Sequence, residues 1–228
     1  MLKINIQVSA QGKWVKLFDG KTFNGWRGYC KTDMPGAWTI EKGTIKIDSK
    51  ATRQGDGGSI IYDQMFSNFE LELKWKVAKG SNSGIFYLAK ELEKYPIHYS
   101  SPEYQVLDNE NHGDAKKGVD GNRKSASLYD MIPAYPQNSK LYGKWNKVKI
   151  KIFDGTVTHY QNGKAVVQYQ LWVPEWAALL NQSKFAENRN TTAFKLLNNC
   201  GGDKREGYIG LQDHGDEVFF KNIRIRTF

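Results

Sequence analysis

The chain has 228 residues, with 33 lysines and arginines against 24 aspartates and glutamates, and a formal net charge of +9. This length suits one large β domain or two small ones, and it can bury a core without a disulfide or metal staple. Two classes are disfavoured, because no apolar stretch approaches the roughly 18 residues of a membrane helix and the lysines are dispersed rather than gathered on a recognition helix.

The N-terminus differs from the rest of the chain. Residues 1–12 are expected to form an N-terminal arm or the remnant of a signal peptide, and residues 13–228 a single domain. Val8-Ser9-Ala10 is similar to the small-residue end of a signal peptide, although the long apolar core of such a peptide is missing. On this signal we expect a periplasmic or secreted protein. The alternative is an ordinary extended arm.

Short segments of alternating apolar and polar residues follow one another along the domain. The clearest runs from Phe69 to Val77, where the apolar residues fall on one face and two glutamates and two lysines on the other. A slip of one residue would bury those four charges, so the register is well specified. The expected strands are 37–40, 44–47, 69–77, 84–88, 104–107, 126–129, 148–153, 156–160, 165–169, 207–212 and 218–226.

Turn and helix signals fit the same architecture. Asn162-Gly163 is a strong hairpin signal, because both residues accept the positive φ that a type I′ turn needs. Short helices are expected over 174–180, which begins with Pro174, and over 191–197. Many short antiparallel strands with so few helices predict an all-β sandwich, barrel or jelly roll.

The polar segment 89–124 is long for a loop in a compact domain, which indicates function. Within it, Glu103 and Gln105 are expected on one face of a strand, where a carboxylate beside an amide suits sugar hydroxyls. Asp108, His112 and Asp114 follow on a loop. They could form a metal site, a catalytic base pair or a turn held by Asx hydrogen bonds.

Two other segments offer polar groups. Gly210 to Gly215 contains Gln212 and a histidine, His214, on a Gly-bounded turn, which is either an accessible functional residue or an incidental one. Tyr129 is expected to share a face with Ser127 and line a cleft. No Gly-x-Ser-x-Gly motif occurs, which disfavours serine-hydrolase chemistry.

The two cysteines, Cys30 and Cys200, show no metal-binding spacing. They are either two thiols or one disulfide that closes a long loop, and the spacing does not decide between these.

Several of these segments together resemble the 3-keto-disaccharide hydrolase domain family, in its Bacteroidetes versions, which belongs to the concanavalin A-like lectin/glucanase superfamily. The resemblance is collinear over residues 13–228. The segments that carry it are Leu17-Phe18-Asp19-Gly20-Lys21 with Gly25-Trp26, Asn82-Ser83-Gly84-Ile85-Phe86, Glu103-Tyr104-Gln105-Val106-Leu107-Asp108, Trp145-Asn146, Gly210-Leu211-Gln212-Asp213-His214-Gly215 and Phe220-Lys221-Asn222-Ile223-Arg224-Ile225.

The resemblance implies a concanavalin A-like jelly-roll β-sandwich of two antiparallel sheets with one or two short helices. It also implies a glycosidase that acts on glycosides whose C3 hydroxyl is oxidised to a ketone, by C2 proton abstraction, elimination and hydration. The ligand would be a small carbohydrate, with no nucleic acid and no membrane span, and a divalent cation is the cofactor left open.

Site residues follow from the resemblance together with the motifs. The base would be Glu103 or His112, and Asp108 and His214 would orient or protonate. Lys76, Gln105 or a divalent cation would face the developing oxyanion. The expected sets are Glu103, His112 and His214 for catalysis, and Lys76, Gln105, Asp108, Tyr129 and Gln212 for substrate binding.

Two other functions compete with this one. A non-catalytic carbohydrate-binding module is the alternative from another class, because the fold hosts lectins as readily as enzymes. The discriminating feature would be a carboxylate or imidazole with a perturbed pKa in the cleft. An ordinary glucanase ranks third, because the paired-carboxylate strand motif is absent, and Lys74 breaks the nearest match at Glu70-Leu71-Glu72.

Overall fold

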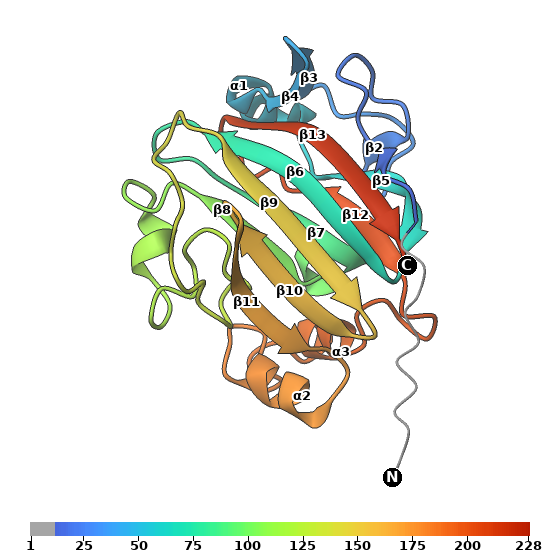
Figure 1. Ribbon diagram of the computed structural model, residues 1–228, viewed down its shortest axis with the longest axis vertical. Coiled ribbons are helices and arrows are strands. Elements are labelled where there is room, and N and C mark those ends of the chain that lie inside the picture. Colours follow the sequence, from blue (N-terminus) through green and yellow to red (C-terminus); the bar gives the residue numbers. More distant parts are fainter. Residues whose placement is uncertain (1–11) are drawn as a thin grey trace.

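The computed structural model describes residues 12–228, and the expectation for residues 1–11 lies outside the described residues. Two sheets pack face to face, with the larger sheet in front in Figure 1 and the smaller one behind it. Every strand pair is antiparallel. The predicted all-β sandwich is therefore confirmed.

The larger sheet has eight strands, and its centre follows the alternation read from the sequence. In β6 (Phe69–Val77), the odd-numbered residues are buried in the core and the even-numbered ones lie on the outer face. Neighbouring strands follow the same rule. In order, the sheet is β11 (Lys164–Gln170), β10 (Thr156–Gln161), β9 (Asn146–Phe153), β6, β13 (Val218–Thr227), β4 (Thr44–Ile47) and β3 (Trp38–Glu41), with β1 (Val15–Lys16) also on β13.

The smaller sheet has five strands and carries most of the chemistry described below. Its inner face contributes Ile85 and Tyr104 to the shared core, while Phe86 belongs to a separate small cluster on the outer face. The sequence pattern missed two of its strands, since none was expected over Trp26–Gly28 or Ile60–Phe66. In order, the sheet is β2 (Trp26–Gly28), β5 (Ile60–Phe66), β12 (Gly207–Leu211), β7 (Asn82–Ala89) and β8 (Glu103–Leu107).

Helices are short and lie outside the sandwich. The two expected ones are present, as α2 (Pro174–Asn181) and α3 (Thr191–Asn198), beside β11 in Figure 1. Within residues 12–228, no helix has the length and apolar character needed to cross a membrane. The remaining helical turns are α1 (Ser49–Ala51), a π turn (Thr52–Asp56) and two 3₁₀ turns (Ile97–Tyr99 and Gly113–Lys116).

The hairpin between β10 and β11 turns at Asn162-Gly163, with φ of 49° and 88°, as expected for a type I′ turn. The strand expected over 126–129 is wrong. The backbone of this segment does run along the edge of β8, and Ala126 N–H donates to Gln105 O at 2.8 Å. However, Ala126 and Asp130 have φ of 68° and 62°, so a regular ladder cannot form. The segment nevertheless covers an edge that would otherwise be open.

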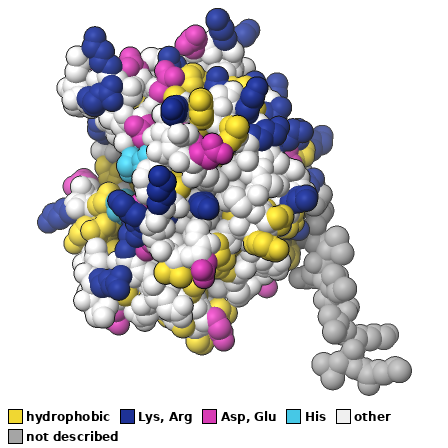
Figure 2. All heavy atoms as spheres, turned by 90° about the vertical axis from the view of Figure 1, so that its left-hand side faces the viewer, with side chains coloured by type: hydrophobic (Ala, Val, Ile, Leu, Met, Phe, Trp, Pro, Cys, Tyr) yellow, Lys and Arg dark blue, Asp and Glu magenta, His cyan; other side chains and the backbone are white. Residues whose placement is uncertain are grey.

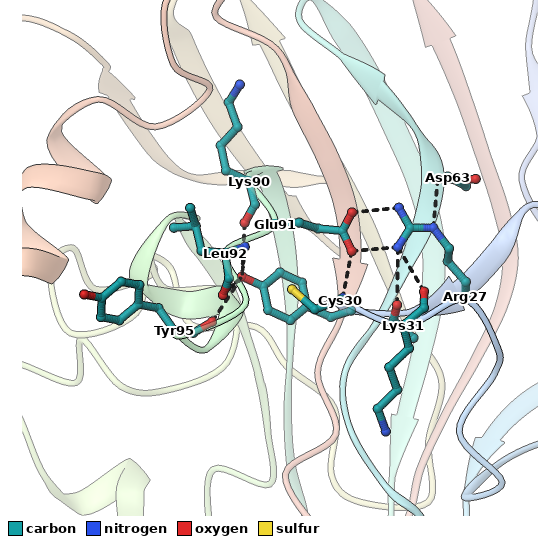
Figure 3. Close-up of polar contacts among 10 residues, drawn as sticks. Arg27, Cys30, Lys31, Asp63, Lys90, Glu91, Leu92 and Tyr95 are labelled. Atoms are coloured by element: carbon teal, nitrogen blue, oxygen red, sulfur yellow. Dashed lines mark hydrogen bonds and ion pairs between the residues drawn. The ribbon is translucent and has the colours of Figure 1, made fainter.

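An ion-pair network braces the smaller sheet against the loop that follows β7 (Figure 3). The Arg27 guanidinium donates to both Glu91 carboxylate oxygens, at 2.6 and 2.7 Å, and its Nε donates to Asp63 at 2.9 Å. The Cys30 backbone N–H adds a third bond to Glu91, at 2.7 Å. The hydrogen bond to Arg27 therefore holds the pKa of Glu91 below its ordinary value, despite burial. Cys30 is exposed, Cys200 is buried, and both are free thiols.

Candidate active site

Glu103 lies at the start of β8 on the outer face of the smaller sheet. Its neighbour Tyr104 points into the core, so alternation turns Glu103 and Gln105 outward together. The carboxylate rests on β7, directly above the backbone of Gly84. A Cβ built on Gly84 would lie 2.1 Å from Glu103 Oε1. The absence of a side chain at this glycine therefore creates the space that the carboxylate occupies.

The Glu103 carboxylate is buried, and it has neither a hydrogen-bond donor nor an ion-pair partner among the described residues. The residue is only 6% exposed. Within residues 12–228, no donor forms a hydrogen bond to its side chain and no cation lies within ion-pair distance. Burial raises the pKa of Glu103 to about 8, while the nearby Lys184 ammonium lowers it and Asp114 raises it further. A carboxyl group with free lone pairs and a pKa close to neutral pH is suited to proton transfer.

Lys184 supplies the opposing charge from a different part of the chain, the loop after α2. Its ammonium lies 4.3 Å from the centre of the Tyr129 ring and 4.9 Å from that of Phe185. Its backbone N–H donates to Asp130 Oδ2 at 2.7 Å, which fixes the loop. Burial lowers the pKa of Lys184, whereas Glu103 raises it. The site therefore contains a carboxyl and an amine whose charges depend on each other.

Asp114 and Tyr129 form a second polar group beside Glu103. The Tyr129 hydroxyl donates to Asp114 Oδ2 at 2.9 Å, and Arg123 donates to Asp114 Oδ1 at 3.0 Å. Arg123 also pairs with Asp130. Burial alone would raise the pKa of Asp114, but these two donors outweigh it and hold the pKa below its ordinary value. Asp114 therefore stays ionised and keeps the Tyr129 hydroxyl and the Arg123 guanidinium in place.

Two histidines and an aspartate converge next to this group. Figure 2 looks onto the side formed by the green loops of Figure 1 and shows histidine side chains between basic and acidic ones. The ring centres of His112 and His214 are 6.1 Å apart. One ligand atom from each of His112, His214 and Asp216 lies within 4.8 Å of the others. Two imidazoles and a carboxylate are suitable donors for a divalent transition metal, so this group could hold one.

Two buried oxygens bear on whether a cation fits there. The Asn82 backbone N–H donates to Asp216 Oδ2 at 3.0 Å, and the Gln212 backbone N–H donates to Gly84 O at 2.9 Å. The side-chain oxygens of Asn82 and Gln212 are both buried without a hydrogen-bond partner among the described residues. Unpaired buried oxygens are costly, so a donor or a cation is expected to approach this end of β7 and β12.

One hydrogen bond sets a condition on metal binding. Asp114 N–H donates to His112 Nδ1 at 3.1 Å, so neutral His112 carries its proton on Nε2. A metal bound through Nδ1 of His112 would replace that hydrogen bond, and a metal bound through Nε2 would displace that proton. Burial lowers the pKa of His112, which keeps the ring neutral. His214 is exposed and Asp216 retains a free oxygen, so these two are the more accessible ligands.

The structure brings most of the expected residues to one side of the molecule, with different roles. Gln105 uses its Oε1 to accept from Val106 N–H and holds the covering segment through Arg123 O at 3.5 Å. Asp108 is a loop-forming residue, because it accepts from Gly80 N–H at 2.8 Å and from Asn111 Nδ2 at 2.8 Å. These hydrogen bonds occupy its carboxylate, so Asp108 fits the alternative in which Asx hydrogen bonds hold a turn.

Lys76 does not join this site, and the expectation that it faces the developing oxyanion is wrong. It lies on the outer face of the larger sheet, with its ammonium 4.1 Å from the Phe219 ring centre and 5.3 Å from that of Trp145. Glu103 lies on the opposite outer face of the sandwich, and the charge near it comes from Lys184 instead. The even-numbered residues of β6 face away from the core, and the core separates the two sheets.

The sequence offered no signal for Lys184 or His98. Lys184 stands alone between Ser183 and Phe185, in a segment without alternation. His98 lies in the loop after β7, where burial, together with the charges of Lys184 and His214, lowers its pKa to about 4. Lys184 approaches Glu103, and His98 approaches Lys184 and Phe185, only through the path of the chain, which periodicity does not encode.

The fold and the site define a class of protein, a two-sheet β-sandwich with a buried carboxyl and a half-buried amine close together on the outer face of the smaller sheet. The family model of the 3-keto-alpha-glucoside-1,2-lyase-like domain matches residues 13–226, and the chain belongs to that family. A relative named 3-keto-disaccharide hydrolase, from Bacteroides thetaiotaomicron, is 54% identical over 100% of this chain and 82% of its own length.

Solved structures agree with this assignment. A crystal structure of a provisionally named glycosyl hydrolase from Parabacteroides distasonis has a TM-score of 0.80 and 28% identity, over 95% of this chain and 94% of that chain. A second one from the same organism has a TM-score of 0.68 and 24% identity, over 95% of this chain and 100% of that chain, and supports the fold alone.

Proposed function

We propose that the protein cleaves 3-keto-disaccharides by removing the C2 proton, eliminating the C1 substituent and adding water. The observation that carries this proposal is the buried, unpaired Glu103 carboxyl with its raised pKa, beside Lys184. A non-catalytic binding module gains nothing from an ionisable group held in so costly a state. Family membership and the name of the 54% identical relative support the same reaction.

The chemistry needs a C3 ketone. The ketone acidifies the C2 proton, and Glu103 takes it. The electrons of the C2–H bond form a C1–C2 double bond as the C1–O bond breaks, and the leaving oxygen gains a proton. Water then adds at C1 and a proton returns to C2, so that the sum is hydrolysis. The overall reaction consumes no proton, but each step needs a group that donates or accepts a proton.

Residues of the chain fill these roles as follows. Glu103 is the base, and the Lys184 ammonium stabilises negative charge that develops on the substrate. The Tyr129 hydroxyl, whose proton is donated to Asp114, is positioned to accept a hydrogen bond from a sugar hydroxyl. The unpaired oxygens of Asn82 and Gln212 accept from sugar hydroxyls. A divalent cation held by His112, His214 and Asp216 would supply Lewis-acid polarisation of a carbonyl oxygen.

The direct test is incubation with a 3-keto-disaccharide and with its unoxidised parent, followed by product analysis. We expect cleavage of the keto sugar alone, because only its C2 proton is acidic. Cleavage of the parent would identify an ordinary glycosidase. If neither sugar is cleaved but both bind, the protein is a carbohydrate-binding module.

The metal group has its own test. Calorimetric titration with Mn²⁺ or Zn²⁺ should show one site per chain, and His214→Ala should weaken it at least about tenfold by removing one of three ligands. Treatment with EDTA should lower the melting temperature of the wild type. His98→Gln is the matched control, since His98 lies nearby but outside the group. Equal affinity in the His214 and His98 variants would show that this group binds no metal.

A further inference from the structure

The outer face of the larger sheet, opposite the candidate active site, carries a second concentration of charge. Across three hydrogen-bonded strands, β9, β6 and β13, side chains stand in lateral rows. One row pairs Glu72 with Lys149 on one side and Arg224 on the other. Arg224 donates to Glu72 at 2.6 Å. The row is complementary in charge, which is the stabilising arrangement for facing side chains.

The next complementary row is Lys151, Glu70 and Arg226, in which Arg226 forms an ion pair with Glu70. A third row breaks this pattern. Lys74 lies directly opposite Lys147 on one neighbouring strand and Lys221 on the other. We name these three residues the lysine row. Within the described part of the chain, no carboxylate lies within ion-pair distance of any of them.

The lysine row carries a cost that the fold does not offset. Adjacent strands are about 4.8 Å apart, and like charges directly opposite each other destabilise a sheet. Among residues 12–228, the one cation–π contact of the lysine row is that of Lys221 with Trp145, at 4.0 Å from the ring centre. Surfaces that concentrate one sign of charge attract ligands of the opposite sign.

The same face is hollowed beside the lysine row. A cavity of about 750 Å³ is lined by five cationic side chains and two acidic ones. Neither acid is available to neutralise the cations, since Glu72 pairs with Arg224 and Asp19 accepts from the backbone of Lys21 and Thr22. A bulge in β13 at Asn222, with φ of 56°, bends the strand where it borders the cavity. The cationic residues are Lys16, Lys74, Lys147, Lys149 and Arg224.

We infer that this face binds a polyanionic glycan, a chain of sugars with carboxylate or sulfate groups. Four lysines and an arginine line a hollow rather than a flat face, which disfavours a flat membrane or a rigid duplex. Single-stranded nucleic acid stacks its bases on open aromatic rings. Here the Tyr160, Phe219 and Trp145 rings each carry a lysine ammonium 4.0–4.1 Å from the ring centre. Lysine ammonium groups and the Asn222 side chain suit anionic groups and hydroxyls instead.

The test is affinity electrophoresis and titration of the full chain with polygalacturonate, dextran sulfate and neutral dextran. We expect both anionic polymers to bind, with affinity that falls as salt rises, and dextran not to bind. The triple variant Lys74→Thr, Lys147→Thr and Lys221→Thr should lose at least about tenfold in affinity. Its melting temperature should stay the same or rise, because the mutual repulsion is removed.

The matched control is Lys50→Thr, Lys195→Thr and Lys204→Thr, which removes the same charge from exposed positions elsewhere. It should bind like the wild type. An equal loss in both variants would show a mere effect of net charge, and tighter binding of poly(dT) or of phosphatidylglycerol vesicles would show another class of partner. Either outcome overturns the inference. Because the readout is binding and not sugar cleavage, failure here leaves the proposed reaction untouched.

Discussion

Glu103→Gln is expected to lower the turnover of a 3-keto-disaccharide at least about a hundredfold, while the protein remains folded. The amide has the shape of the carboxyl group but cannot take the C2 proton, and general-base help contributes about 10²–10⁴-fold. The carboxylate accepts no hydrogen bond from residues 12–228, so the substitution breaks no existing hydrogen bond. Steady-state kinetics with the wild type and the variant measure the effect.

The pH dependence of the same pair gives an independent check. If Glu103 is the base, kcat/KM of the wild type should rise with pH and level off near the pKa of about 8. Stability should move the other way. The folded protein holds the Glu103 proton more tightly than the unfolded chain, so stability falls as pH rises from 4.5 to about 8. The Gln variant should lose this component of the stability profile.

Glu110→Gln is the matched control, because Glu110 is an exposed glutamate on the loop that follows the same strand. It should retain wild-type kinetics. Turnover within a few fold of wild type in the Glu103 variant would remove Glu103 from the mechanism.

Gly84→Ala is expected to reduce kcat at least about tenfold with little loss of stability. The added methyl group would lie 2.1 Å from Glu103 Oε1, so the carboxylate must move. The atoms that must move, Oε1, Cδ and Cγ of Glu103, all belong to a side chain, and the backbone at Gly84 does not have positive φ, so the strand itself can keep its conformation. Kinetics and thermal unfolding on one preparation separate the two effects.

Gly113→Ala is the control for loss of a glycine, since nothing lies within 4 Å of a Cβ built there. It should change neither kcat nor the melting temperature appreciably. If Gly84→Ala kept full activity, the position of the Glu103 carboxylate above β7 would not matter to the reaction.

Periodicity predicted the parts of the fold in which one face of a strand meets the core. β6 was predicted with its full bounds, because a shift of one residue would turn its four charged side chains into the apolar core. β5 was missed, since Ile60, Ile61 and Tyr62 precede a polar run without alternation. The segment 126–129 has strand-like composition, but positive φ at Ala126 is set by its packing against β8, which local sequence does not reveal.

The site was predictable to the extent that its residues share a strand or a motif. Glu103 and Gln105 follow from the period of two along β8. Lys184 could not be predicted, because its approach to Glu103 depends on how the chain after α2 folds back over Tyr129. Lys76 was misplaced because alternation divides a strand into two faces but does not show which face borders a ligand.

The interdependence of Glu103 and Lys184 has a consequence for ligand affinity. An uncharged sugar that displaces water from around the pair makes both charges costlier, so Glu103 takes up a proton or Lys184 releases one as the sugar enters. The dissociation constant of a ligand that never ionises should therefore vary with the acidity of the medium, and the heat of association should depend on the buffer that exchanges the proton.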